Sequence, residues 1–143
     1  MGYSTQANLQ DAITLERLKQ LTDDESAGTV NAARCLVAIG AADSLIDSYL
    51  RGTRTVPLDP VPERIAQVSV DLATYFLYKR RRDFEMPADL VKDYDRQISF
   101  LKDVATGKVL LDTPAAVTNT GGVFKTNKDS GSRIFNSDKW GTY

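Results

Sequence analysis

Apolar side chains recur every three or four residues between positions 29 and 51, the spacing that lines one face of a helix. Thr29 is placed to cap this helix at its start and Gly52 to end it. Asp43 interrupts the apolar face, and Gly40 with its alanine neighbours makes the helix thin enough for another helix to approach closely. The predicted face consists of Leu36, Ile39, Ile46 and Leu50, widened by Val37, Ala41, Leu45 and Tyr49.

Two further long helices are predicted, from residue 62 to 78 and from about 87 to 106. Pro62 suits the first turn of the earlier one, because an N–H there has no helical partner to lose. Gly107 is a ready C-terminal stop for the later one. The apolar positions are Ile65, Val68, Leu72, Tyr75 and Phe76 in the first of these helices and Leu90, Tyr94, Ile98, Leu101 and Ala105 in the second.

Shorter elements complete the predicted bundle. Ser4 or Thr5 caps a short helix that ends near Ile13, and Thr14 caps a second one. Three prolines in residues 56–62 remove backbone donors and favour an extended loop. Residues 108–111 are expected to be a short extended piece. The pattern therefore predicts an all-α fold, a small helical bundle over residues 1–112.

The periodicity stops after Thr113, and residues 113–143 are polar and glycine-rich. Such a segment buries too little apolar surface to fold alone, so we expect an extended tail that becomes ordered on a partner. The alternative is a terminus with incidental aromatic residues. The candidate docking residues are Phe124, Ile134, Phe135, Trp140 and Tyr143.

Composition changes this picture mainly by what it excludes. The 143 residues contain no histidine, which removes Ser-His-Asp triads, Cys-His pairs and ordinary zinc sites. The single cysteine, Cys35, lies in an apolar run and is expected to be a buried thiol in a reducing compartment.

A net charge of −1 gives no general attraction to nucleic acid or membrane. The start of the chain lacks the pattern of a signal peptide, and no apolar stretch has membrane-spanning length. We expect a protein that is not an enzyme and holds no cofactor.

The acidic loop at residues 22–28 invites comparison with a calcium loop. Counted from Asp23, however, Ala27 falls at a ligand position, and Arg34 falls where a bidentate carboxylate belongs. We therefore expect a solvated acidic turn and no metal.

The dense basic cluster has two interpretations; it consists of Lys79, Arg80, Arg81 and Arg82. Cations at the end of a helix complement its dipole and bind its last carbonyl groups. Four adjacent cations exceed that need, so the alternative is phosphate contact that is salt-sensitive and independent of sequence. No recognition-helix pattern or aromatic platform accompanies the cluster.

Asp43 and Asp71 lie on or beside apolar faces, where a carboxylate must be paired or hydrogen-bonded. Two carboxylates on facing helices could perform acid–base chemistry, as in glycoside hydrolases. We favour a structural role, with bonds to an arginine such as Arg64 or a hydroxyl such as that of Tyr78.

Core and turn residues across residues 3–112 form a recognisable series. In order they are Tyr3–Thr5, Leu9, Leu21–Asp23, Ile46–Leu50, Val56–Leu58, Val61–Pro62, Asp71–Ala73, Leu77–Tyr78 and the segment 107–111. This series resembles the Mu-like prophage family of small head–tail connector proteins, encoded beside the major capsid gene. Many members are richer in Asp and Gly in the loop after Thr22, so the resemblance carries no metal over to this chain.

The resemblance implies a virion structural protein, an adaptor or head-completion subunit with a helical connector fold. Such subunits form a ring under the portal, matching its twelvefold symmetry, and link it to a tail terminator or other neck protein. The implied location is the virion neck, with assembly in the host cytoplasm and without membrane. Non-specific contact with packaged DNA would involve Lys79–Arg82. The residues leave open a small helical DNA-binding protein using that cluster and, as the weakest alternative, a hydrolase using Asp43 and Asp71.

Overall fold

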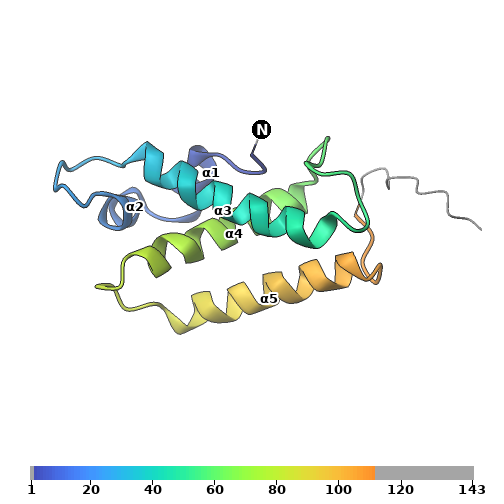
Figure 1. Cartoon of the computed structure of the whole chain (residues 1–143). Helices are drawn as coiled ribbons and strands as arrows, with labels where there is room; N and C mark the ends of the chain where they lie inside the picture. The colour runs from blue at the N-terminus through green and yellow to red at the C-terminus, as the bar shows by residue number, and fades with distance from the viewer. Residues whose placement is uncertain (1, 112–143) are drawn as a thin grey trace, which may run out of the picture.

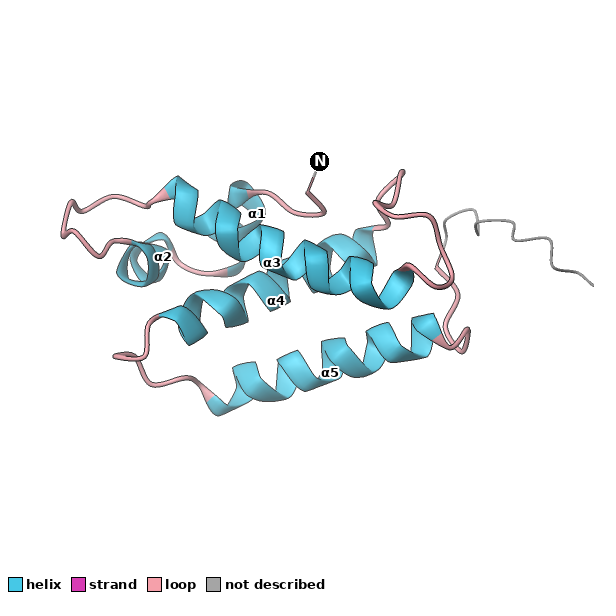
Figure 2. Cartoon of the chain, viewed as in Figure 1, coloured by secondary structure: helices cyan, strands magenta, loops and turns pink. Residues whose placement is uncertain are grey.

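The computed structural model describes residues 2–111, which contain five helices and no strand. The helices are α1 (Gln6–Ala12), α2 (Leu15–Thr22), α3 (Ala32–Leu50), α4 (Glu63–Arg80) and α5 (Ala88–Ala105). The three long helices run antiparallel to their neighbours in the chain (Figures 1 and 2). The all-α prediction is confirmed. No helix of the described range is long and apolar enough to cross a membrane.

Helix α4 is the centre of the bundle, because it packs against each of the other four helices. Its buried side chains therefore surround it instead of forming one stripe, and they include Ile65, Leu72 and Leu77, all fully buried. Helix α5 contacts only α3 and α4 among the helices. There Tyr75 of α4 stacks on Tyr94 of α5 with ring centroids 4.1 Å apart.

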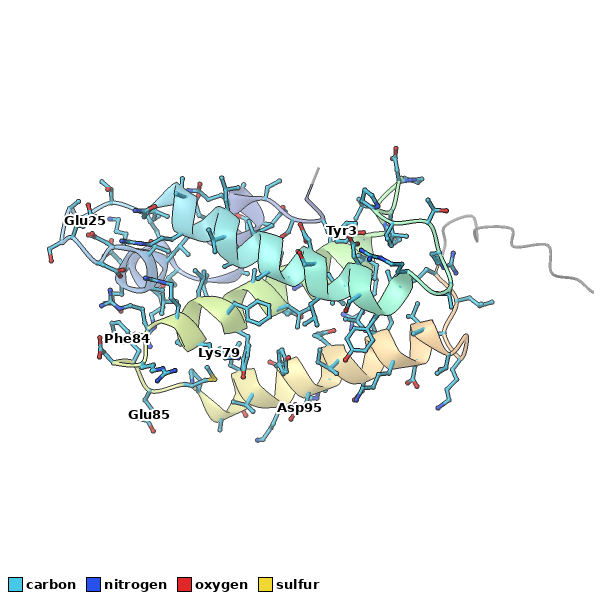
Figure 3. The ribbon with its side chains drawn as sticks, in the orientation of Figure 1. Tyr3, Glu25, Lys79, Phe84, Glu85 and Asp95 are labelled. Carbon is cyan, nitrogen blue, oxygen red and sulfur yellow. The ribbon has the colours of Figure 1, made fainter. Side chains whose placement is uncertain are left out.

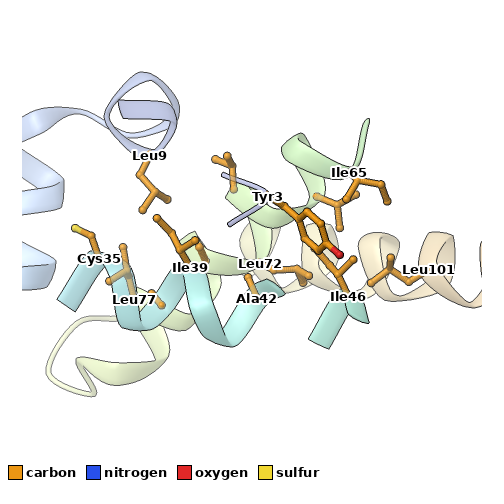
Figure 4. Close-up of a cluster of buried hydrophobic side chains, with 14 of the residues drawn as sticks. Tyr3, Leu9, Cys35, Ile39, Ala42, Ile46, Ile65, Leu72, Leu77 and Leu101 are labelled. Carbon is orange, nitrogen blue, oxygen red and sulfur yellow. The ribbon is translucent and has the colours of Figure 1, made fainter. Parts of the chain in front are cut away.

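The core receives fully buried side chains from every helix, and Figure 4 labels some of those from α1, α3, α4 and α5. Leu9 comes from α1, Leu18 from α2, Ile46 from α3 and Leu101 from α5. Cys35 lies at the α3 side of this core with no exposed surface, which confirms the predicted buried thiol. Burial raises the pKa of that thiol.

The predicted apolar face of α3 is wrong in part. Leu36 and Val37 are 62% and 73% exposed, whereas Ala38 and Ala42 are buried. Ile39, Ile46 and Leu50 of the predicted face are buried, and the small residues Ala38 and Ala42 complete the buried side in place of Leu36 and Val37. Gly40 also points outward, since nothing beyond its chain neighbours and its own helix backbone lies within 4 Å of where its Cβ would stand.

The ends of the helices follow the predicted chemistry with one correction. Thr5 and Thr14 cap α1 and α2 as expected. The cap of α3 is Asn31, not Thr29: the Asn31 Oδ1 accepts a hydrogen bond from the Arg34 N–H at 3.2 Å. Gly107 follows α5 at φ 77°, the left-handed conformation that glycine adopts readily. Residues 108–111 form no strand.

Candidate functional site

The acidic loop and the basic end of α4 meet around one carboxylate, that of Asp24. The Arg80 guanidinium donates to both of its oxygens, with Nη1–Oδ2 and Nη2–Oδ1 distances of 2.6 and 2.8 Å. Arg81 Nη1 lies 2.6 Å from Oδ1, and Arg34 Nη2 lies 3.3 Å from Oδ2. Hydrogen bonds from Arg80 and then Arg81 hold the pKa of Asp24 well below its usual range. Three arginines, one from α3 and two from the C-terminal end of α4, thus hold the loop in place.

The structure divides the cluster Lys79–Arg82 into two pairs. Arg80 and Arg81 point to the acidic loop, where they also donate to the carbonyl groups of Leu21 and Asp23. Lys79 and Arg82 are exposed. Figure 3 shows Glu25 of the loop and Phe84, beyond the end of α4, at the same end of the bundle. The geometry fits the helix-end interpretation and leaves fewer cations for phosphate.

Asp23 closes the acidic loop from within. Its carboxylate accepts backbone N–H groups of Glu25, Ala27 and Gly28 at 3.2, 3.0 and 2.6 Å. These bonds, that from Ala27 first, lower its pKa. Both aspartates of the loop are therefore engaged by donors of the protein. Within residues 2–111, no group of three His, Cys, Asp or Glu side chains is arranged to hold a metal ion.

The N-terminal segment is held to the bundle by Tyr3, a contact that the sequence did not predict. The Tyr3 hydroxyl donates to the Asp47 carboxylate of α3 and accepts the Leu58 N–H at 3.1 Å. Burial and then the bond to Asp47 raise the pKa of Tyr3 to about 12. One side chain thus joins the N-terminus, α3 and the proline loop, which we define as residues 51–62.

Asp43 of α3 also holds the N-terminal segment to the bundle. Its Oδ2 accepts the Tyr3 N–H at 3.1 Å, and its Oδ1 accepts the Ser69 hydroxyl at 2.7 Å. The Ser69 oxygen lies 2.7 Å from that of Ser4, and Ser69 has already donated its one proton, so Ser4 is the donor of this bond. Burial raises the pKa of Asp43. A hydroxyl chain from the N-terminus through α4 therefore ends on α3.

Asp71 lies in a separate network between α4 and α5. Its oxygens accept the Gln67 and Gln97 side-chain amides at 2.9 and 2.7 Å, and Arg64 donates to Gln97 Oε1 at 3.0 Å. Burial is the main cause that raises the pKa of Asp71. Arg64 therefore reaches Asp71 through Gln97, a residue that the sequence analysis did not single out.

Tyr78 belongs to neither carboxylate network. Its hydroxyl accepts a hydrogen bond from Arg17 Nε at 3.0 Å, and the same guanidinium carbon lies 5.2 Å from the centroid of its ring. The four polar residues Asp43, Arg64, Asp71 and Tyr78 are thus distributed over three networks. Each network joins segments that are distant in the sequence, as structural polar groups do.

Two surface features of the described residues differ in character from these internal contacts. The first is the outer face of α3, which carries no charge and consists of Ala33, Leu36, Val37, Gly40, Ala41 and Ser44, all exposed. The second, the proline-loop cleft, has a volume of about 440 Å³ and lies between the proline loop, the start of α4, α5 and the last described residues. It is lined by Pro60, Val61, Pro62, Glu63, Arg64, Phe100, Val109, Leu110 and Leu111.

The candidate docking residues of the tail, Phe124, Ile134, Phe135, Trp140 and Tyr143, lie outside the described residues.

Comparison with known proteins gives two matches. Residues 3–126 match a family model described as Bacteriophage Mu, Gp36. A protein of Haemophilus influenzae described as Mu-like prophage FluMu protein gp36 is 32% identical over 109 residues, which cover 76% of this chain and 74% of that protein. The family match covers the described bundle from Tyr3 onward.

Proposed function

Since the chain belongs to the bacteriophage Mu Gp36 family, we propose that this phage protein is a structural component of the virion. Its specific role in this proposal is that of a head–tail connector. Subunits form a ring, with the portal's twelvefold symmetry, between the portal and a tail terminator or other neck protein. The protein acts in the virion neck, is assembled in the host cytoplasm, and needs neither cofactor nor catalysis.

One observation supports this proposal above the others: the polar residues that could carry chemistry are engaged inside the fold. The carboxylates of Asp24, Asp43 and Asp71 each accept bonds from at least two donors of the protein. The surface carries a helix face without charge and a cleft lined mainly by apolar residues together with Glu63 and Arg64. Such features suit contact with other proteins better than contact with a small substrate.

The proposal is tested by removing the gene from a phage that encodes the chain. We expect filled heads and separate tails to accumulate, and the gene supplied in trans to restore complete particles, as seen by electron microscopy. Normal yields of infectious particles without the gene would contradict the proposal.

A second test addresses the proposed docking tail. We expect a chain without residues 113–143 to keep its helical circular dichroism, because the core is formed by the described bundle. The same chain should no longer bind purified portal rings in negative-stain images. Undiminished binding would show that the tail is not the portal contact.

The alternative of DNA binding rests on Lys79 and Arg82, the exposed cations of the cluster that do not pair with Asp24. A mobility shift that survives physiological salt, and that is lost when both are changed to Ala, would support it. Arg80 and Arg81 contribute less to this alternative, because Asp24 already pairs with both.

A further inference from the structure

We propose that residues 121–126 fold back over the proline-loop cleft of their own chain, with the Phe124 side chain inside the cleft and Lys125 beside Glu63. The inference goes beyond the proposed function and does not depend on it. It assigns Phe124 to the bundle, whereas the other candidate residues of the tail remain candidates for a portal contact. These are Ile134, Phe135, Trp140 and Tyr143.

The cleft presents apolar surface that the described residues leave uncovered. In its lining, Leu110 is 81% exposed and Val61 is 39% exposed. The ring of Phe100 belongs to the same lining. A volume of about 440 Å³ exceeds that of a phenylalanine and a valine side chain together. An aromatic side chain in the cleft removes apolar surface of both partners from water, which favours its occupation.

The chain leaves the described bundle at the cleft itself. Residues 109–111 are part of the lining, so residues 112–143 begin at its edge. The chain from Leu111 to Phe124 spans up to about 40 Å when extended, which leaves ample length for a return to the cleft. Residues 119–122, Asn-Thr-Gly-Gly, include the residue types that favour a tight reversal. Covalent attachment gives an effective concentration of about millimolar, so even a weak contact is populated.

The tail around Phe124 matches the cleft in chemistry. Val123 and Phe124 form an apolar pair with the first aromatic ring after the bundle, and Lys125 follows them directly. The lining is mainly apolar and contains one carboxylate, that of the exposed Glu63. The guanidinium of Arg64, also in the lining, already donates to a glutamine side chain and lies over an aromatic ring. An apolar pair followed by a cation therefore fits both the apolar lining and its carboxylate.

The extent of the family match supports the same division of the tail. The match continues beyond the described bundle and ends at residue 126, shortly after Phe124. The matched region thus includes the proposed contact and excludes the four later candidate residues. This extent is expected if the segment around Phe124 packs on the bundle and the rest of the tail does not.

Disulfide formation tests the placement of the segment. In a Cys35→Ala chain, Val61→Cys puts one thiol in the cleft lining, and Thr126→Cys puts the other next to the proposed contact. Phe124 and Lys125 stay unchanged in this cleft pair. With oxidised glutathione at low protein concentration, we expect a disulfide within one chain to form about tenfold faster than in the control pair, because the contact raises the local thiol concentration.

The control pair carries Val91→Cys in place of Val61→Cys. Both valines are 39% exposed, but Val91 lies near the start of α5, at the end of the bundle away from the proline loop (Figure 1). Adding Phe124→Ser to the cleft pair should slow disulfide formation to the control rate. Equal rates in the two pairs would overturn the proposal. Disulfides formed mainly between chains would also overturn it, because the segment of another copy would then occupy the cleft.

The pairing of Lys125 with Glu63 is tested by exchanging the charges. Lys125→Glu should slow disulfide formation in the cleft pair, because it brings two carboxylates together, and adding Glu63→Lys should restore the rate. Lys128→Glu is the control and should leave the rate unchanged. An unchanged rate in Lys125→Glu would contradict this pairing.

Amide hydrogen exchange provides a second measurement on a chain that keeps Cys35. Phe124→Ser should make exchange in residues 107–111 several-fold faster, because the cover of the cleft is lost. Phe135→Ser removes a phenylalanine outside the proposed contact and should leave this exchange unchanged. The same exchange in Phe124→Ser as in the unchanged chain would overturn the proposal. Neither measurement involves the portal or the phage, so this inference and the proposed function can fail separately.

Discussion

Tyr3 carries the attachment of the N-terminal segment, because its hydroxyl bonds to both Asp47 and the Leu58 N–H. We predict that Tyr3→Phe lowers the free energy of unfolding by about 1–2 kcal/mol, since it leaves the Leu58 N–H without its partner. Denaturant titration at neutral pH measures this change. Tyr75→Phe is the control, because the Tyr75 ring is only partly buried. Equal losses in both variants would contradict the assignment.

The same hydroxyl should make the stability of the fold depend on pH in the alkaline range. The pKa of Tyr3 is raised from 10.0 to about 12, so between these values the folded chain keeps a proton that the unfolded chain has lost. Stability should therefore fall as the pH rises from about 10 to 12 and level off above that range. Tyr3→Phe should show a smaller fall over this range. An identical pH dependence in both chains would remove Tyr3 as its cause.

Gly2 and Gly40 allow a matched comparison of the same Gly→Ala substitution in crowded and in open surroundings. A Cβ on Gly2 would stand 2.8 Å from Asp43 Oδ2, an oxygen held in place by the Tyr3 N–H. We predict that Gly2→Ala destabilises the fold by about 1 kcal/mol through this clash. Gly40→Ala has open space and a helical backbone, so it should stabilise by about 0.5–1 kcal/mol. Thermal unfolding compares them, and shifts of the same sign would contradict the assignment.

At the residue scale, the sequence identified the capping and buried polar residues more accurately than it identified their hydrogen-bond partners. The caps Thr5 and Thr14 follow local rules and were found where expected. The embedded aspartates were recognised, but their donors Ser69 and Gln97 lie on other helices. Spacing within one helix carries no information about which polar residue of another helix faces it.

At the scale of elements, the acidic loop depends on Asp24. We predict that Asp24→Asn loosens the contact of the loop with α3 and α4, because three guanidinium groups lose their common anion. Amide hydrogen exchange should become faster in residues 21–31 and 80–84 and stay unchanged in α5. Asp89→Asn is the control, since it removes only an exposed pair with Lys92.

Because the pKa of Asp24 is lowered in the folded chain, the stability that its carboxylate gives to the loop decreases toward acid pH. Its stabilising effect is complete above the ordinary carboxyl pKa and is lost only as the pH falls through the lower folded value. Mild acid should therefore leave exchange in the loop of the unchanged chain as slow as at neutral pH, once intrinsic rates are corrected. Loosening in mild acid would show that another group controls the loop.

The orientation of α3 shows where prediction of elements stops. Its position and length followed from periodicity, but apolar residues occur around most of its circumference. A face with Leu36 and a face with Ala38 and Ala42 both fit the helical spacing. Only the packed neighbours decide between them, and they bury Ala38 and Ala42 beside Ile39 and Ile46 while Leu36 stays exposed. The exposed aliphatic pair therefore could not be predicted from the sequence.

For the molecule as a whole, α4 unites the bundle, because every other helix packs on it. We predict that Leu72→Ala costs about 2–5 kcal/mol, as expected for a fully buried leucine. The loss should appear as one cooperative transition observed by helical and aromatic signals together. Leu15→Ala, at a position 48% exposed, is the control and should change stability by less than about 0.5 kcal/mol. Separate transitions would contradict a single cooperative unit.

Because Cys35 is fully buried, the rate at which its thiol reacts can report how often the bundle opens around α3. Because the chain has no other thiol, a thiol-specific reagent can modify it only when α3 separates from the core. The rate of labelling in native buffer therefore reports how often that separation occurs, without any added probe. If assembly into a ring restrains α3, Cys35 should react more slowly in assembled copies than in free ones. The rate of Cys35 modification would then measure assembly.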